Sequence, residues 1–445
     1  MLYGTIIELL ISFSPKTINF INRSALEQYM DDVFEEWNSY ARQKKLKSRD
    51  INLESLKRNS GIKIVAVTGM RRSGKSSLLM LLHQKLREKN KVAYVNLEDS
   101  RIKDDKNVLD NVLKWFGDNG YLLLDEITSV NDWEGWLARN HEMLKGRLKL
   151  ITSSSRKNLV VPAKPLRGRM LKYELYTLSF KEFMNFKGIK YETTTLGKGK
   201  VKKALEEFLI FGGFPEVVLT EINIDKIQLI NSYFNDILGL DVSEISGENI
   251  NVVETFGKYV IEAPYFSASK CLNYFKSLGY KIGKQSILDL EGYAQTSYLF
   301  FFTQIFSNNI KDRTQYPRKA YLGDTGFMNA ISGKKDKGRL YENAVFLELK
   351  RRLNDNQEIN YWKDKSSECD FVIREGLKVK DAMQVSYDID NDKTFRREIN
   401  GIVTCAEEFG LKKGIIITKD YESEEKHNKI NLKFIPLWKW LIKEK

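Results

Sequence analysis

Residues Gly69 to Ser76 read G-M-R-R-S-G-K-S, which fits the phosphate-binding pattern G-x-x-x-x-G-K-[ST]. Glycines at both ends of such a loop let successive backbone N–H groups curl around an anion. The lysine reaches the β- and γ-phosphates of a nucleotide, and the hydroxyl after it ligates Mg²⁺. The pattern therefore predicts a nucleotide-binding loop. Its predicted contact residues are Gly69, Met70, Arg71, Arg72, Ser73, Gly74, Lys75, Ser76 and Ser77.

The segments on either side of this loop are those that the motif requires. The β-branched run 62–68 predicts a buried strand, and the apolar-rich run 77–86 predicts a helix. The order strand, glycine loop and helix favours a true phosphate-binding loop over the alternative, a chance match in a surface loop. The helix N-terminus would add to the attraction for phosphate.

Two carboxylates follow a second apolar segment. Residues 121–124 read Y-L-L-L, and Asp125 and Glu126 come directly after them. Charges at the carboxyl end of a buried parallel strand lie where ligands bind in open α/β sheets. We expect Asp125 to hold Mg²⁺, through water, and Glu126 to orient and deprotonate the attacking water. The alternative, a solvated turn, is disfavoured because the two motifs support each other.

Composition narrows the class of protein. A chain of 445 residues is long enough for two to four domains. Three cysteines and three histidines without metal-ligand spacing argue against a zinc site or a disulfide framework. The apolar stretch 2–13 contains Glu8 and is too short to span a bilayer. We expect this stretch to pack on the protein, and we expect a cytoplasmic chain with no membrane span.

Strands alternate with helices around the two motifs, which predicts a parallel α/β sheet. Further strands are expected over 91–97 and 148–152, and an exposed loop over 187–202. A charged helical lead-in precedes the sheet. The predicted domains are the lead-in at 1–50, a nucleotide domain at 51–220, a helical region at 221–335 and a C-terminal domain at 336–445.

At this point the chain resembles the prokaryotic AAA-type P-loop ATPases, in particular the archaeal ATPase group. Beside G-M-R-R-S-G-K-S, L-L-L-D-E-I and I-T-S-S-S, it carries the family's Gly-Arg element at 166–169, its L-S-F-x-E-F signature at 178–183 and its G-G-[YF]-P-E element at 212–216. The resemblance covers roughly residues 50 to 220, and the combination is specific. It implies an AAA-type parallel sheet that binds ATP and Mg²⁺, and ATPase activity.

The resemblance also implies roles for two residues beyond the loop. Ser154 would be the polar sensor at the end of the fourth strand, with Thr152 and Ser153 as alternatives. Arg169 would sense or stabilise the γ-phosphate, as an arginine finger does. A surface salt bridge is the alternative for Arg169, because several basic residues surround it.

Residues 267–306 are similar to a winged helix-turn-helix. A serine-capped helix over 267–279, a glycine turn, a second helix over 284–295 and a strand-like run over 298–306 follow one another. Such a fold would present a recognition helix to a groove of double-stranded DNA. A formal charge of +13 permits DNA as a partner. The alternative, a winged helix that only packs within the ATPase, is equally compatible with the sequence. The residues placed for DNA contact are Lys281, Lys284, Gln285 and Ser286.

The C-terminal domain is similar to the restriction-endonuclease-like, PD-(D/E)xK-type domains that are often fused to these ATPases. The resemblance assigns Glu342, Asp370 and Gln384 to a metal site, but Ser386 stands where that family has lysine. Without the lysine, attacking water loses its cationic stabiliser, although Lys378 or Lys380 would be a substitute. We therefore expect weak or no DNA cleavage.

The sequence thus favours an ATPase that hydrolyses Mg-ATP to drive a conformational switch. Two alternatives stay open. One is a DNA-binding module with a slow regulatory ATP site, and the other is an ATP-controlled, metal-dependent nuclease. A homo-oligomer is compatible with all three.

Overall fold

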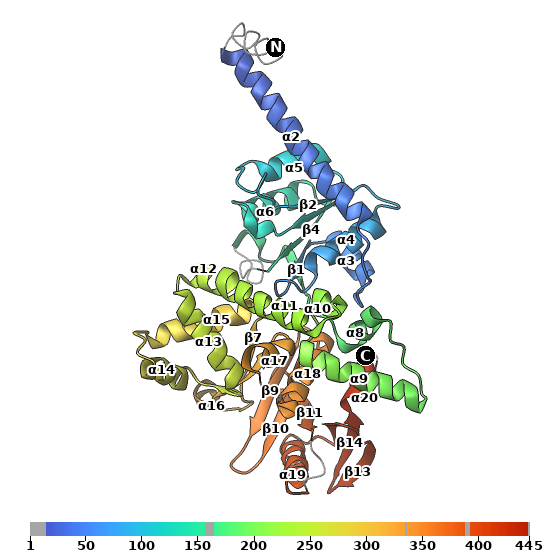
Figure 1. Ribbon diagram of the computed structural model, residues 1–445, viewed down its shortest axis with the longest axis vertical. Coiled ribbons are helices and arrows are strands. Elements are labelled where there is room, and N and C mark those ends of the chain that lie inside the picture. The colour runs from blue at the N-terminus through green and yellow to red at the C-terminus, as the bar shows by residue number, and fades with distance from the viewer. Residues whose placement is uncertain (1–14, 156–163, 334–335, 388–391, 444–445) are drawn as a thin grey trace. The chain divides into compact units, whose positions relative to one another are not determined.

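The structure is a computed structural model that describes residues 15–155, 164–333, 336–387 and 392–443 (Figure 1). The side chains of 15–26, 310 and 392–394 are outside the description. The expected packing of residues 2–13 also falls outside it. The chain forms two compact units, one from residues 1–68 and 75–174, the other from 69–74 and 175–445. The predicted division into four domains stays a prediction.

The first unit is built on a five-stranded sheet in the order β2-β3-β4-β1-β5, with every neighbouring pair parallel. This confirms the predicted parallel α/β sheet. The central strands β1 and β3 are buried along their whole length, as their apolar runs require. The strands are β1 Ile64–Thr68, β2 Val92–Asn96, β3 Gly120–Asp125, β4 Leu148–Ser154 and β5 Met170–Glu174.

Helices pack against this sheet and complete its core. Helix α2 contacts β2, α4 and α5 (Figure 1). It buries Val33 and Phe34 in the same apolar cluster as the strands. The indole N–H of Trp37 donates to Asp99 Oδ2 at 2.8 Å, which fixes α2 beside the end of β2. The predicted helical lead-in is therefore part of the sheet's packing. The helices are α2 Pro15–Gln43, α3 Leu53–Ser60, α4 Lys75–Leu86, α5 Val108–Phe116 and α6 Trp133–Met143.

The register of the sheet gathers polar residues at one edge. Thr68 of β1 pairs with Ser154 of β4, and Asn96 of β2 pairs with Asp125 of β3. The carboxyl ends of four neighbouring strands thus end level with one another. Ligands of open α/β sheets bind at this edge.

The second unit begins with helices. The exposed loop predicted over 187–202 is wrong from Thr195 onward, where α9 begins. The Thr194 hydroxyl caps this helix by accepting the Gly197 N–H at 3.0 Å, and its apolar face buries Val201 and Phe208. The segment is helical because burial of this apolar face outweighs the low helix propensity of its glycine and threonine residues. These helices are α8 Phe180–Lys187, α9 Thr195–Phe211, α10 Pro215–Leu219, α11 Asn223–Asp236, α12 Glu244–Ser246 and α13 Ile250–Glu262, with a π-helix at Ile237–Ser243 between α11 and α12.

A small three-stranded antiparallel sheet, in the order β6-β8-β7, follows with its helices. Helices α14 and α15 occupy the predicted positions, whereas β7 is shorter than the predicted strand-like run. Helix α17 leads from β8 toward the C-terminal part. The elements are β6 Tyr265–Phe266, α14 Ala268–Ser277, α15 Lys284–Thr296, β7 Phe300–Thr303, α16 Ile310–Gln315, β8 Arg318–Leu322 and α17 Gly326–Ser332.

The C-terminal part carries a six-stranded mixed sheet in the order β13-β14-β12-β11-β10-β9. Strands β9, β10 and β11 form an antiparallel meander, and β11 continues parallel to β12. Helix α19 contacts β10 and β11. The elements are α18 Lys337–Arg352, β9 Gln357–Lys363, β10 Glu368–Glu375, β11 Lys378–Ser386, α19 Asp392–Glu408, β12 Lys413–Thr418, β13 Ser423–His427, β14 Ile430–Pro436 and α20 Leu437–Ile442.

The turn after α9 is held by a buried carboxylate. Asp324 is 1% exposed, and its oxygens accept the N–H groups of Gly213 and Gly326, both at 2.9 Å. Burial raises the pKa of Asp324 above its ordinary value, and these hydrogen bonds oppose that shift. Gly212 has φ +76°, and a Cβ there would lie 1.6 Å from Asp324 Oδ1. The glycine is therefore required both by its backbone and by the contact.

Gly212→Ala is expected to destabilise the second unit. The backbone conformation alone costs an alanine about 1–3 kcal/mol, and the collision with Asp324 adds to this. Gly292→Ala is the matched control, because Gly292 lies on exposed α15 and a Cβ added there would have no atom within 4 Å. That change should stabilise the helix by about 0.5–1 kcal/mol. Denaturant titration measures both; midpoints that move in the same direction would contradict the assignment.

Candidate active site

The phosphate-loop pattern forms a tight turn directly after β1. Gly69, Arg72 and Gly74 have φ values of +154°, +66° and +100°. A Cβ at Gly69 would lie 2.1 Å from the carbonyl oxygen of Leu175, so the first glycine of the pattern is required by close backbone approach. Alternation of left-handed and right-handed residues is the backbone arrangement that turns N–H groups inward to form an anion nest.

Lys75 and Ser76 begin α4 and face the two predicted carboxylates of the first unit. Lys75 Nζ lies 3.7 Å from Glu126 Oε1, and the lysine is 4% exposed. The Ser76 hydroxyl is hydrogen-bonded to the Asp125 carboxyl group. The structure thus brings together the four residues for which the sequence predicts phosphate, magnesium and base roles.

Asp125 is 1% exposed at the end of β3 and is held by hydroxyl donors. Tyr94 OH donates to its Oδ2 at 2.7 Å, and Ser153 Oγ donates to its Oδ1. Burial, followed by the charge of Glu126, raises the pKa of Asp125 above its ordinary value. A cation at this carboxylate would offset both causes, because it favours the ionised form.

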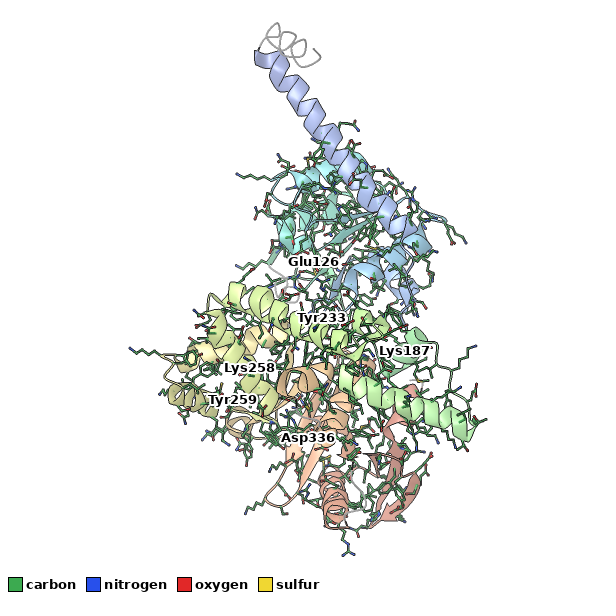
Figure 2. The ribbon with its side chains drawn as sticks, viewed as in Figure 1. Glu126, Lys187, Tyr233, Lys258, Tyr259 and Asp336 are labelled. Carbon is green, nitrogen blue, oxygen red and sulfur yellow. The ribbon has the colours of Figure 1, made fainter. Side chains whose placement is uncertain are left out.

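Glu126, labelled in Figure 2, lies directly after β3 and has left-handed backbone angles, φ 50° and ψ 48°. Its N–H donates to Ser153 Oγ at 3.1 Å, and its Oε2 accepts the Ser155 N–H at 3.4 Å. A non-glycine residue in this region costs free energy and persists where neighbours fix it, as at functional sites. Glu126 is therefore held in place by the end of β4, through its backbone, and by the residue after β4, through its carboxylate.

The serines at the end of β4 have different contacts. Ser153 joins both acidic residues, through Asp125 Oδ1 and the Glu126 N–H, whereas the hydroxyl of Ser154 lies 2.6 Å from Thr128 Oγ1. The sensor role stays a prediction for Ser154, and Ser153 is the alternative that contacts both acidic residues. Tyr94 was missed by sequence reasoning, because only the pairing of β2 with β3 brings it to Asp125.

These residues fit a magnesium nucleotide. A serine hydroxyl beside a buried carboxylate is the donor set that Mg²⁺ takes in phosphate-loop proteins, and an ammonium lies close by. Ser155 Oγ is also buried and has no hydrogen-bond partner among the described residues. A buried hydroxyl without a protein partner could take one from a ligand or from water.

Arg169 lies at the opposite end of the sheet. It comes just before β5, its carbonyl accepts the N–H of Ile64 at the start of β1, and its guanidinium lies 3.6 Å from Glu142. The length of β1, about 13 Å, separates this end from the carboxyl edge. A γ-phosphate role for Arg169 stays a prediction.

The predicted DNA-contact residues lie together on the surface. Lys281 is exposed in the turn after α14, and Lys284 and Gln285 are exposed on the first turn of α15. Ser286 is partly buried, and the Gln285 amide donates to Asp289 Oδ1 on the same helix at 2.9 Å. The two lysines are therefore the strongest candidates for contact with phosphate.

The three residues assigned to a nuclease-like site also come together, but around an unexpected cation. Lys319 Nζ on β8 lies 3.0 Å from Glu342 Oε1 and 2.7 Å from Asp370 Oδ1. Gln384 Oε1 accepts the Asp370 N–H at 2.9 Å. Sequence reasoning missed Lys319 and Glu368. Glu368 was detectable, because it precedes Asp370 by two residues and a strand places such residues on one face.

Comparison with known proteins identifies the family. A family model described as an AAA domain matches residues 62–184, and two domains of unknown function, DUF8612 and DUF4143, match 202–338 and 337–440. The uncharacterized protein MJ1544 of Methanocaldococcus jannaschii is 33% identical over 90% of this chain and 92% of its own length. The chain belongs to this AAA-type ATPase family. An uncharacterized protein of Haemophilus influenzae is 24% identical over 81% of this chain and 90% of its own.

Solved structures give weaker likenesses to this AAA-type chain. A STAND protein with a tetratricopeptide repeat sensor from Pyrococcus horikoshii is 11% identical over 70% of this chain and 47% of its own, with a TM-score of 0.28. A DNA polymerase III gamma subunit-related protein from Thermotoga maritima is 11% identical over 56% and 100%, with a TM-score of 0.26. Both scores are too low to carry an inference.

Among the described helices, none is long and apolar enough to cross a membrane.

Proposed function

We propose that this chain binds and hydrolyses Mg-ATP. The observation that carries the proposal is the group formed by Lys75, Ser76, Asp125 and Glu126, with 3.7 Å between the ammonium and the Glu126 carboxylate. The Lys75 ammonium is paired with Glu126 when no ligand is bound, and it lies where it could bind the phosphate of a nucleotide. The AAA domain matched over 62–184 supports the same activity.

Each residue has a distinct task in this proposal. Bound Mg²⁺ would offset charge on the β- and γ-phosphates. Ser76 and Asp125 would hold the ion, and Lys75 would move from Glu126 toward the γ-phosphate. Glu126 would then be free to accept a proton from the attacking water at its carboxylate oxygen. The Ser155 N–H, which donates to Glu126 Oε2, and the hydrogen bond from the Glu126 N–H to Ser153 Oγ keep that carboxylate aimed during the exchange.

The phosphate loop is also joined to helices of its own compact unit, which supports a conformational switch. Arg71 Nε lies 3.3 Å from Oδ2 of Asp241, a residue of the π-helix that is 2% exposed. The Arg72 guanidinium lies 5.6 Å from the ring centroid of Tyr233 on α11. π-Helical turns are frequent at functional sites. Phosphate that draws either arginine inward would alter these contacts, so the loop and the π-helix would change together.

ATP turnover with and without duplex DNA tests the proposal. Phosphate release that depends on Mg²⁺ is expected from the wild-type chain, and its absence at every ATP concentration would contradict the assignment. Stimulation by DNA would favour a DNA-directed switch. Unchanged turnover would favour a protein partner instead.

A DNA-binding module with a slow ATP site is the second candidate. The helices α14 and α15 with the antiparallel strands β7 and β8 have the order of a winged helix-turn-helix, and this supports the proposal that α15 is a recognition helix. The exposed lysines at its start favour contact with phosphate. Cytoplasmic location and self-assembly stay predictions.

Neutralising Lys281 and Lys284 together is expected to weaken duplex binding. Each lost phosphate contact should also reduce the slope of log affinity against log salt by about one unit. Fluorescence anisotropy with labelled duplex at several salt concentrations measures both effects. Lys198→Ala with Lys200→Ala is the control, because these lysines are exposed on α9 of the same unit. Equal losses in the two double variants would indicate non-specific attraction, and none in either would favour the packing alternative.

A further inference from the structure

Lys319 lies at the centre of three carboxylates in the C-terminal half of the chain. Its Nζ is 2.7 Å from Asp370 Oδ1, 3.0 Å from Glu342 Oε1 and 3.0 Å from Glu368 Oε1. The side chain is only 6% exposed. An ammonium has three N–H donors, so each donor can serve a different carboxylate. The cation is therefore fully coordinated by groups from α18 and β10.

The surrounding groups stabilise this charge distribution. Burial acts against the charged form of Lys319, but Asp370 and Glu342 raise its pKa well above the ordinary value. Burial also acts against ionised Glu368, whereas the Lys319 charge and the hydrogen bonds from Tyr265 and Lys363 lower the pKa of Glu368 to about 2. The ammonium and the Glu368 carboxylate consequently stay charged across the neutral range.

Several other polar atoms of the cluster are also engaged. Tyr321 OH donates to Glu342 Oε1 at 2.7 Å, and the Val385 N–H donates to Asp370 Oδ2 at 2.9 Å. Gln384 donates its amide to Glu398 and accepts from the Asp370 backbone, so its carbonyl is occupied. By contrast, Ser386 Oγ is buried without a hydrogen-bond partner among the described residues. It stands where the nuclease resemblance expects a lysine.

We propose that the Lys319 ammonium occupies the position that a divalent cation would take in this nuclease-like cluster, so that the domain is locked without a metal and does not cleave nucleic acid. Mg²⁺ and Ca²⁺ bind oxygen at about 2.0–2.6 Å, and a cation at the centre of these oxygens would overlap Nζ. Within the described residues, no three His, Cys, Asp or Glu are arranged to hold a metal ion. The resemblance implies a metal site at these residues, whereas the structure places the Lys319 ammonium among them.

Lys319 is not a displaced catalytic lysine. It comes from β8 in the three-stranded sheet, whereas Ser386 ends β11 of the six-stranded sheet. A catalytic lysine would stabilise an attacking water beside a metal, but the donors of Lys319 all have carboxylate partners within 3.0 Å. Its side chain instead ties the small sheet to β10 and α18.

Lys319→Met tests the proposal in the full-length chain, because methionine keeps the length and removes the charge. Wild type should bind no Mn²⁺ at the cluster. The variant should unfold at lower temperature, gain about one bound Mn²⁺ per chain and recover thermal stability when Mn²⁺ is added. Electron paramagnetic resonance counts free Mn²⁺, and calorimetry follows unfolding. The same experiment on Lys319→Met with Asp370→Asn should lose the added binding. Lys311→Met, at an exposed lysine on α16, is the control.

Mn²⁺ bound by wild type and lost in Asp370→Asn would overturn the proposal, because a metal would then share the site with Lys319. A folded Lys319→Met chain that gains no Mn²⁺ would also overturn it. Lys319→Gln is the milder second variant if the first does not fold. If neither folds even with Mn²⁺ present, a divalent cation cannot replace the ammonium and the proposal fails. Plasmid cleavage by wild type that disappears in Asp370→Ala would likewise contradict it.

Discussion

Glu126→Gln is expected to leave ATP bound while lowering its hydrolysis by about 10²-fold or more, because the amide keeps the shape and cannot accept the proton. The backbone of Glu126 is held by Ser153, and its side chain by the Ser155 N–H, so glutamine should take the same position. Loss of the negative charge next to Lys75 should also release the ammonium toward phosphate. Isothermal calorimetry with Mg-ATP measures binding, and steady-state phosphate release measures turnover.

Glu88→Gln is the control for this substitution, because Glu88 is exposed beyond the end of α4. It should bind and hydrolyse like wild type. Normal hydrolysis by Glu126→Gln would show that another group is the base. Loss of binding along with turnover would instead assign Glu126 to holding the nucleotide or its metal.

Lys75→Ala is expected to abolish ATP binding and hence turnover. The lysine contributes a compact charge at the end of the phosphate loop, buried to 4% exposure beside Glu126. Its removal leaves backbone N–H groups to hold the phosphates and leaves the two acidic residues to repel them. Binding of a fluorescent ATP analogue and phosphate release both report the loss.

Lys85→Ala is the matched control, since Lys85 is on the same helix and pairs with Glu54 at the surface, 3.0 Å away. This variant should retain binding, because surface pairs contribute little to stability. Circular dichroism separates loss of the site from loss of the fold. Wild-type turnover in folded Lys75→Ala would remove the central claim.

The grouping of Lys75 and Ser76 with Asp125 and Glu126 was predictable from sequence because its determinants are local. The loop and the first turn of α4 are contiguous, and Asp125 with Glu126 end an unmistakably apolar strand. The order of the strands was not predictable in the same way. Strand β1 lies between β4 and β5, both far along the chain, and nothing near β1 in the sequence indicates which strands will pair with it. The contact of Tyr94 with Asp125 depends on that order.

The contacts of Lys319 were even harder to predict from the sequence. Glu342, Asp370 and Gln384 were found because a resemblance pointed to them, but their cation comes from a residue 51 positions before Asp370. No spacing rule links the two positions. The sequence difference at Ser386 predicted an altered site, which stays a prediction, and only the three-dimensional contacts show that Lys319 pairs with the carboxylates.

The strand order has a consequence for the timing of synthesis. Strand β1 emerges early from the ribosome, yet its two neighbours in the sheet, β4 and β5, are among the last elements of the first unit to be made. At roughly 5–20 residues per second, β1 waits roughly 4–20 s before β4 can pair with it. During this interval its β-branched residues are exposed, which makes the nascent segment a natural client for a chaperone.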